Sequence, residues 1–317
     1  MKTTFQLLLT ALVFIATASL TNAQTPEVTP EVTHNTWTSG AAMPTARMTA
    51  AAIVVGTSIH VIDGYTPGGF TNVHEIYNTK KNTWTTGTPD PNTRGFVAYA
   101  VVDKILYIFG GSNGSENLDL TESYNPSTDT WTTLAPMPYA EQTAAAVADK
   151  DIIYVIGGNS PGTGFLTSVL SYNTTTNTWA EEAPLAAATA WEAVGLLGAT
   201  VVEADGGNAT ESLDSVEGYN VKKNTWTELT ADPTARNPGC YAVIAGQFYV
   251  AGGNSNGTNI TVNESYSPKT KSWTTLAPMP DGVYQAAASA VAGGRLYCFG
   301  GGLFPNIGYN NVQIYQP

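Results

Sequence analysis

Six of the seven tryptophans recur at an almost constant interval, and this interval limits the possible fold more than any other feature of the sequence. They are Trp37, Trp84, Trp131, Trp179, Trp226 and Trp273, separated by 47, 47, 48, 47 and 47 residues. A tyrosine lies seven residues before each of the last five, and Tyr315 extends the series at the end of the chain. Glycine pairs follow most of the tryptophans by about 26 residues. A period of this length is typical of propeller blades or solenoid turns.

Each repeat contains four short strand-like segments, which we call a, b, c and d. In the third repeat they read TAAAVA (143–148), IIYVIGG (152–158), SVLSYN (168–173) and TWAEEA (178–183), with alternating or fully apolar patterns. Turns such as NTKKN and NPSTD begin with Asn, connect c to d, and favour a tight reversal. Residues 33–317 are therefore predicted to form an all-β, six-bladed β-propeller with four antiparallel strands per blade.

The strand count also predicts how the ring closes. Segments a, b and c occur six times, but only five d segments follow them. The missing one is TWTSG, around Trp37, which precedes the first a segment. We expect this N-terminal strand to complete the last blade, whose other three strands come from residues 283–316.

The succession of glycine pair, tyrosine and tryptophan, with APMP after two of the tryptophans, resembles the Kelch repeat. The resemblance covers essentially all of residues 33–317. It implies a Kelch-type propeller, a fold that carries binding modules and a few enzymes, so the fold alone does not select a function.

The N-terminus predicts the compartment. Residues 1–23 combine Lys2, an apolar run and small residues before Gln24, the order of a secretory signal peptide cleaved after Ala23. Residues 24–32 form a Thr/Pro-rich lead-in. We expect a secreted protein, extracellular or periplasmic, with no membrane span after cleavage. Cys240 and Cys298 are expected to be buried free thiols, although an oxidising compartment would permit one bridge.

Charge and motif content exclude several functions. Without Lys2, 12 basic and 25 acidic residues remain, a formal net charge of −13 that repels phosphate backbones and excludes nucleic acid as a partner. His34, His60 and His74 lack the spacing of metal ligands, and phosphate-binding glycine loops and hydrolase motifs are missing from the sequence. We expect a monomer without metal or cofactor.

Three of the four arginines share one position in the repeat. Arg47, Arg94 and Arg236 each lie ten residues after a repeat tryptophan, where the d–a loop reaches strand a; Glu141, Thr189 and Val283 hold this place in the other repeats. One interpretation is that the arginines brace neighbouring loops. The other is a ring at the channel mouth that holds a carboxylate bidentately. Kelch domains that bind acidic peptides use arginines at matching positions, and the resemblance implies the same role here, with Glu141 interrupting the ring.

The fourth repeat departs from the others in both inner strands. Strand a contains Trp191 and Glu192, and strand b contains Glu203 and Asp205 where we align Tyr107 and Phe109 of the second repeat. Burying an unpaired charge is costly, so these acids require water, partners or the channel. Either these substitutions have no function and the side chains face solvent, or one of the acids is a general acid or base with a raised pKa.

Two functions remain in view, besides that of a purely structural surface protein. The leading hypothesis is a binding module that uses the face formed by the d–a and b–c loops to hold a protein or a small anionic or carbohydrate ligand. Aromatic loop residues would add contact area. The candidate ligand-binding residues are Arg47, Arg94, Arg236, Glu141, Tyr139, Tyr284, Trp191 and Glu192.

The alternative is an extracellular sugar-modifying enzyme of the sialic acid mutarotase (N-acetylneuraminate epimerase) type. Some secreted bacterial Kelch propellers have this activity, and ring opening needs an acid or base near an anion-holding arginine. Glu141, Glu192 or Glu203 beside Arg94 or Arg236 are the candidates, but the sequence contains no diagnostic motif and we assign no catalytic residue.

Overall fold

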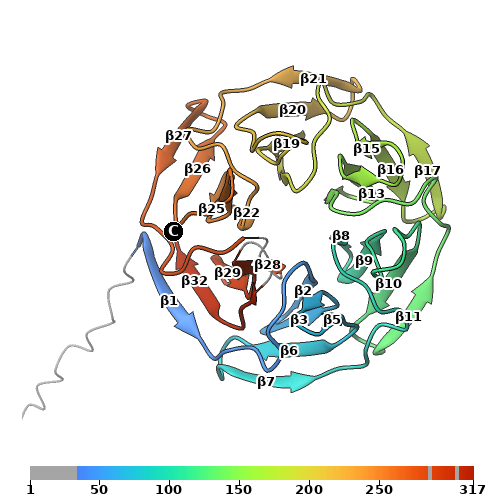
Figure 1. Cartoon of the computed structure of the whole chain (residues 1–317), viewed down its shortest axis with the longest axis vertical. Coiled ribbons are helices and arrows are strands. Elements are labelled where there is room, and N and C mark those ends of the chain that lie inside the picture. Colours follow the sequence, from blue (N-terminus) through green and yellow to red (C-terminus); the bar gives the residue numbers. More distant parts are fainter. Residues whose placement is uncertain (1–33, 285–287, 304–306) are drawn as a thin grey trace, which may run out of the picture. The chain divides into compact units, whose positions relative to one another are not determined.

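The computed structural model describes residues 34–284, 288–303 and 307–317. The expected signal peptide and lead-in, residues 1–23 and 24–32, lie outside the described residues. Regular structure in the described ranges consists of β-strands, and no helix found in them is long and apolar enough to cross a membrane. Six four-stranded antiparallel sheets are arranged as blades around a common axis (Figure 1). The predicted six-bladed β-propeller is confirmed.

The four strands of each blade follow the predicted order from the axis to the rim. We number the blades 1 to 6 in the order of their innermost strands. The innermost strands, a, are β2 (Ala51–Val55), β8 (Ala98–Val102), β12 (Ala145–Asp149), β18 (Ala193–Leu197), β22 (Cys240–Ile244) and β28 (Ala288–Ala292). The b strands are β3 (Ser58–Ile62), β9 (Ile105–Phe109), β13 (Ile152–Ile156), β19 (Thr200–Ala204), β23 (Gln247–Ala251) and β29 (Arg295–Phe299).

The outer half of each blade contains strands c and d. The c strands are β6 (His74–Asn78), β10 (Thr121–Asn125), β16 (Val169–Asn173), β20 (Val216–Asn220), β26 (Asn263–Ser267) and β32 (Val312–Gln316). The d strands, at the rim, are β7 (Thr83–Thr86), β11 (Thr130–Thr133), β17 (Thr178–Glu181), β21 (Thr225–Glu228), β27 (Ser272–Thr275) and β1 (Thr36–Gly40).

Short hairpins project from four of the b–c loops. They pair β4 (Tyr65–Thr66) with β5 (Gly69–Phe70), β14 (Asn159–Ser160) with β15 (Gly164–Phe165), β24 (Asn254–Ser255) with β25 (Thr258–Asn259), and β30 (Gly302–Leu303) with β31 (Ile307–Gly308). The b–c loops and the d–a loops lie at the same end of the blades, because the chain runs in opposite directions along strands a and b.

The repeated tyrosine and tryptophan are cross-strand neighbours that connect adjacent blades. In blade 1, Tyr77 pairs with Trp84 across strands c and d, and their ring centroids lie 5.0 Å apart. The Trp84 indole N–H donates to the Ala41 carbonyl in the loop that leaves blade 6, and Tyr77 Oη donates to Asn82 in its own c–d turn. Every other blade repeats the indole contact with the loop of its neighbour. The repeat therefore marks the contacts that hold the blades in a ring.

The N-terminal strand closes the ring as predicted. The strand β1 pairs antiparallel with β32, and Trp37 lies opposite Tyr315. The Trp37 indole donates to the Ala277 carbonyl at 2.8 Å, which is the same interblade contact that the other tryptophans make. Asn35 accepts hydrogen bonds from both Tyr315 Oη and the Ala277 backbone N–H. Blade 6 is thus built from both ends of the chain (Figure 1).

The expectation of free thiols is wrong, because Cys240 and Cys298 form a disulfide. Cys240 lies at the start of β22 in blade 5 and Cys298 in β29 of blade 6, so the bridge joins two neighbouring blades. The two residues are 58 positions apart and lie in different repeats, and their approach depends on how the blades pack. Both side chains are buried.

We expect the double variant Cys240→Ala/Cys298→Ala to lose about 2–4 kcal/mol of unfolding free energy, because the bridge restricts the unfolded chain across a loop of 58 residues. Urea unfolding followed by tryptophan fluorescence measures this loss. A reductant should lower the stability of the wild type to a similar degree and leave the variant unchanged. Equal stability of the wild type with and without reductant would contradict the expectation.

Candidate functional site

The three arginines lie inside the blades rather than at the channel mouth. Arg94 is fully buried and its guanidinium contacts three carboxylates: Glu122 at 2.6 Å, Asp90 at 3.0 Å and Asp63 at 3.4 Å. Asp63 directly follows strand b of blade 1, whereas Glu122 belongs to strand c of blade 2. Arg94 therefore holds two neighbouring blades together, and its pKa is raised by these acids despite burial.

Arg47 and Arg236 make the same kind of contact. Arg47 donates to Glu75 at 2.9 Å and to the carbonyl oxygens of Val61 and Val73. Arg236 pairs with Glu264 on strand c of its own blade; it also pairs with Asp232 at 3.3 Å and Asp205 at 3.7 Å. Both guanidinium groups are fully buried. The brace interpretation describes these contacts. The expected ring of ligand-holding arginines at the mouth is corrected, because all three side chains are buried in the blades, where carboxylates and carbonyl oxygens accept most of their donors; Arg47 Nε and Arg94 Nη1 have no partner among the described residues.

Asp63 and Asp205 replace a glycine that the other blades have at the end of strand b. Both have a left-handed backbone, φ 66° and 65°, as do Gly110 and Gly157 at the equivalent position. An aspartate in this region is strained relative to glycine, and its carboxylate reaches the arginine of the next blade. The pairing also corrects our alignment, because the glycine pair of blade 4 lies one residue later than in its sisters. Glu203 therefore matches Ile108, not Tyr107.

Four residues with left-handed backbones surround the channel mouth, each two positions after the arginine position of its repeat. They are Thr49, Phe96, Thr143 and Trp191, with φ of 59°, 57°, 63° and 60°. Backbone hydrogen bonds link them in sequence around the mouth, from Phe96 N–H to the Thr49 carbonyl, Thr143 to Phe96 and Trp191 to Thr143. Pro238 follows in blade 5 and has no N–H to continue the chain.

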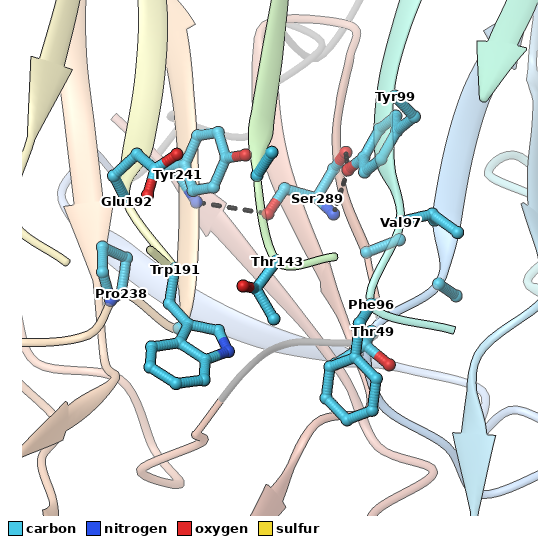
Figure 2. Close-up of a pocket in the computed structure, with 14 residues that line it drawn as sticks. Thr49, Phe96, Val97, Tyr99, Thr143, Trp191, Glu192, Pro238, Tyr241 and Ser289 are labelled. Carbon is cyan, nitrogen blue, oxygen red and sulfur yellow. Dashed lines mark hydrogen bonds between the residues drawn. The ribbon is translucent and has the colours of Figure 1, made fainter. Parts of the chain in front are cut away.

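This conformation is rare for bulky and β-branched side chains, and strained residues of this kind gather at functional sites. We define the mouth site as Thr49, Phe96, Thr143, Trp191 and Glu192. These residues line a cavity of about 90 Å³ at the axis of the propeller, and Figure 2 shows Trp191 and Phe96 at its edge with Thr143 between them.

Three buried polar atoms of the mouth site have no hydrogen-bond partner in the described structure. They are Thr49 Oγ1, Trp191 Nε1 and one carboxyl oxygen of Glu192, Oε2. The other carboxyl oxygen, Oε1, accepts from the Ala145 backbone N–H at 3.1 Å. Buried polar groups in folded proteins are nearly always paired, so three unpaired ones in residues that line a single cavity indicate a place where a ligand or ordered water supplies the partners.

Hydrogen bonds between Tyr99, Ser289 and Tyr241 span the channel on the inner side of the mouth site. Tyr99 Oη of blade 2 donates to the Ser289 carbonyl of blade 6 at 3.1 Å, and Ser289 Oγ accepts from the Tyr241 backbone N–H of blade 5 at 3.2 Å (Figure 2). Burial raises the pKa of Tyr99 to about 12, so its hydroxyl stays protonated. These contacts form the floor of the cavity.

Aromatic side chains of the b–c hairpins extend the site outward. Phe165 contacts Trp191 with ring centroids 5.7 Å apart. On the other side, Tyr65, Phe70 and Phe96 form a cluster with centroid distances of 5.1–6.2 Å. All five side chains are half-buried, so each leaves part of a ring exposed beside the mouth.

Glu192 is the acidic residue of the mouth site. Burial raises its pKa to about 8, and the Ala145 hydrogen bond offsets only part of this effect. The carboxyl group is consequently protonated in most molecules at neutral pH. It can then both donate and accept a hydrogen bond.

The raised pKa predicts a pH-dependent stability. Between its ordinary pKa near 4.5 and about 8, folded Glu192 holds a proton that the unfolded chain releases, so stability falls as the pH rises through this interval. At about 1.4 kcal/mol per pH unit, we expect Glu192→Gln to be more stable than the wild type by up to about 3 kcal/mol at pH 7 and equally stable at pH 4. Urea unfolding at several pH values measures this difference.

The control for this comparison is Glu116→Gln, which removes a carboxyl from an exposed b–c loop. It should follow the wild-type curve at every pH. A constant offset between Glu192→Gln and the wild type from pH 4 to pH 8 would show that Glu192 is ionised in the native state.

The structure separates the predicted site residues. Trp191 and Glu192 meet at the mouth. Tyr139 lines a different cavity, in blade 3, and Glu141 is buried with its Oε2 unpaired and its pKa raised by burial and by Glu192. Tyr284 is half-buried and its backbone bridges to Gly302.

Sequence reasoning missed Thr49, Phe96 and Thr143. The repeat spacing could have identified them, because they share one repeat position with Trp191. Their residue types differ, however, so no common side-chain chemistry marks this position.

The histidines are less scattered than the sequence suggests. His60 and His74 pair across strands b and c of blade 1, with ring nitrogens 2.9 Å apart. Burial lowers the pKa of His60 to about 4, with a smaller contribution from His74. The described residues contain no group of three His, Cys, Asp or Glu side chains arranged to hold a metal ion.

Comparison with known proteins supports the family. The model of the KLHDC2/KLHL20/DRC7 Kelch-repeats domain matches residues 28–191, and that of the Kelch motif matches residues 235–280. The solved structure titled "Structure of YjhT" is similar to this chain with a TM-score of 0.73 and 17% identity, covering 86% of this chain and 95% of the other. No curated protein matches the sequence. With the repeat contacts and six blades in place, the chain belongs to the Kelch-repeat family of β-propellers.

Proposed function

We propose that this chain is a binding module whose ligand inserts a polar group into the mouth site. The observation that carries the proposal is that three residues lining one cavity each have an unpaired buried atom: Thr49 Oγ1, Trp191 Nε1 and Glu192 Oε2. Leaving a buried polar atom unpaired costs about 1–3 kcal/mol. A ligand that supplies the missing partners recovers that free energy on binding.

The composition of the site favours a neutral, hydroxyl-rich ligand. The cavity of about 90 Å³ admits a group of a few atoms, so the rest of the ligand lies on the rings of Phe96, Trp191 and Phe165. Aromatic rings offer an apolar face beside polar contacts, which suits a sugar ring. Among the described residues that line the cavity there is no lysine or arginine, and the buried arginines give no support to an anionic ligand.

We further propose that the protein acts outside the cytoplasm. The Cys240–Cys298 disulfide supports this, because structural disulfides persist mainly in oxidising compartments. The signal-like sequence of residues 1–23 agrees with it.

The test is a neutral-glycan array screened with the chain from residue 24 onward, followed by calorimetry with the sugar that binds best. Trp191→Phe removes the indole N–H but keeps an aromatic ring, and Phe96 already holds the same left-handed position in blade 2. We expect this variant to bind about five- to a hundredfold more weakly, since it loses a buried donor. Tyr107→Phe, which removes a hydroxyl bonded to Thr174 in a c–d turn at the other end of the blades, is the control. Equal affinities of Trp191→Phe and the wild type would exclude the mouth as the site.

One observation favours a second candidate, a sugar-ring-opening enzyme of the mutarotase type. Glu192 has a pKa of about 8 and an unpaired oxygen on the cavity, so it can transfer a proton near neutral pH. The arginines that the sequence interpretation places beside it lie in the blades, which favours a neutral sugar over a sialic acid. Anomer exchange measured by NMR on the bound sugar tests this. Glu192→Gln should abolish exchange while binding persists; exchange at the wild-type rate would eliminate Glu192 as the acid or base.

A further inference from the structure

Blade 4 retains the acid that pairs with the buried arginine in its sister blades but lacks the arginine. In blades 1, 2 and 5 the arginine contacts a glutamate on strand c, as Arg47 contacts Glu75. The same place on strand c of blade 4 holds Glu217, whereas the arginine position holds Thr189. The threonine side chain is too short to reach where a guanidinium would lie.

A cavity occupies the position left by the arginine. Its volume is about 340 Å³, and its lining includes Thr189, Glu203, Ser215 and Glu217. In blade 1 the Arg47 guanidinium bonds the carbonyl oxygens of Val61 and Val73 and the carboxylate of Glu75.

The strand register carries these contacts over to blade 4. Val61 lies opposite Glu75 in blade 1, and Glu203 lies opposite Glu217 in blade 4. Ser215 directly precedes strand c, as Val73 does. The blade-4 cavity therefore has the same arrangement of acceptors, plus the additional carboxyl group of Glu203.

Two buried side chains on this cavity have no partner among the described residues. Glu203 Oε1 and Thr189 Oγ1 are unpaired, and the two residues are only 2% and 3% exposed. No ion pair in the described structure joins Glu203 or Glu217 to a basic side chain, in contrast to the acids of the three arginine blades. Burial raises the pKa of Glu203 well above its usual range, and the nearby Glu192 and Glu217 add to this effect. Such a shift is expected for a buried carboxyl group that has no cation beside it.

The blade-4 cavity is open to solvent on its outer side. Ala186, Ala187, Asp214 and Glu228 line it and are exposed. Two further acids at the opening give it a negative potential that attracts cations. Small residues at positions 186 and 187 leave the way in unobstructed.

The two other blades without an arginine do not share this chemistry. Blade 3 has a cavity of about 490 Å³, but Leu170 replaces the strand-c acid in its lining. In blade 6, the Gln313 side chain occupies the equivalent place, accepting from the Asp281 N–H and donating to the Asp281 carbonyl. Among the described blades, blade 4 alone combines the cavity with the carboxylates.

We propose that the blade-4 cavity binds a guanidinium group from outside the chain, with Glu217 as its anionic partner and Glu203, Thr189 and Ser215 as further acceptors. The planar guanidinium fits because three sister blades already hold one at this place, and its fork of N–H donors matches carboxylates and carbonyls together. A free alkylguanidine and an arginine side chain of a peptide share this chemistry. The site is separate from the mouth and does not depend on the function proposed there.

Calorimetry at low salt, with the chain from residue 24 onward, tests the proposal. The probes are ethylguanidine and the peptide acetyl-Gly-Arg-Gly-amide, each beside its ammonium counterpart, ethylamine and the Lys peptide. We expect binding of at least one guanidinium probe, more tightly than its ammonium counterpart. The guanidinium probe that binds more tightly identifies the kind of ligand. Tighter binding of ethylguanidine indicates a small molecule, and tighter binding of the Arg peptide indicates an arginine side chain of a peptide.

Three variants locate the binding. Glu217→Gln should weaken it roughly ten- to a hundredfold, since a charge-assisted bond is lost. Thr189→Arg should abolish it, because the new side chain occupies the cavity as Arg47 does in blade 1. Glu116→Gln, which removes an equal charge from an exposed loop, and Trp191→Phe at the mouth should change nothing.

The proposal is overturned if neither guanidinium probe binds the wild type, or if binding is the same in Glu217→Gln and Thr189→Arg as in the wild type. Circular dichroism and a thermal melt check that each variant is folded. If Thr189→Arg folds poorly, Glu217→Gln still tests the proposal, because residue 217 is partly exposed and glutamine has nearly the same shape as glutamate.

Discussion

Replacing Arg94 with methionine is expected to lower the free energy of unfolding by about 3–5 kcal/mol. The substitution preserves much of the side-chain volume but removes the charge that faces Asp63, Asp90 and Glu122. These carboxylates would then have to be protonated or remain buried without a cation. Urea unfolding followed by tryptophan fluorescence gives the free energy, and the loss should shrink at acidic pH, where the acids are neutral.

Two further variants distinguish this electrostatic cause from a packing defect. Arg295→Met removes a guanidinium that is exposed and contacts Gln316, so it should change stability by less than about 0.5 kcal/mol. Asp63→Gly combined with Arg94→Met should recover part of the loss, because glycine fits the left-handed backbone at position 63 and one unpaired acid disappears. If the double variant is no more stable than Arg94→Met, charge burial is not the cause.

Deleting residues 24–40 is expected to abolish cooperative folding. The deletion removes β1, exposes the backbone edge of β32 and leaves the buried Tyr315 without its Trp37 and Asn35 contacts. An unpaired strand edge next to newly exposed apolar side chains is prone to pair with another molecule. We expect aggregation in size-exclusion chromatography and loss of the sharp thermal transition.

Point variants on β1 provide a graded version of the same test. Trp37→Ala removes the ring contact with Tyr315 and the indole bond to Ala277, and should destabilise by about 3 kcal/mol or more. Ser39→Ala, on an exposed position of the same strand, should be nearly neutral. A deleted chain that remains monomeric and melts at the wild-type temperature would contradict closure by β1.

The candidate site was only partly predictable. Trp191 and Glu192 attracted notice because they break the pattern of their repeat, and both lie at the mouth. The spacing also predicted correctly that Arg47, Arg94 and Arg236 share one position in the repeat. It did not predict that their side chains point into the blades. A loop position two residues from the mouth can send a long side chain to the axis or back into the blade, and here the carboxylates inside the blades, such as Glu75, Glu122 and Glu264, draw the arginines inward.

The sequence alone determined the number of blades, the four strands in each and the closure by the N-terminal strand. It could do so because every repeat makes the same local contacts: Tyr beside Trp across strands c and d, and the indole bonded to the adjacent loop. Three other features could be seen only in the folded chain: the buried ion pairs, the Cys240–Cys298 bridge and the unpaired atoms at the mouth. The disulfide and the ion pairs Arg94–Asp63 and Arg236–Asp205 join residues from different blades, and the unpaired atoms of the mouth come from blades 1 and 4. Such contacts depend on how the blades pack around the axis rather than on spacing within one repeat.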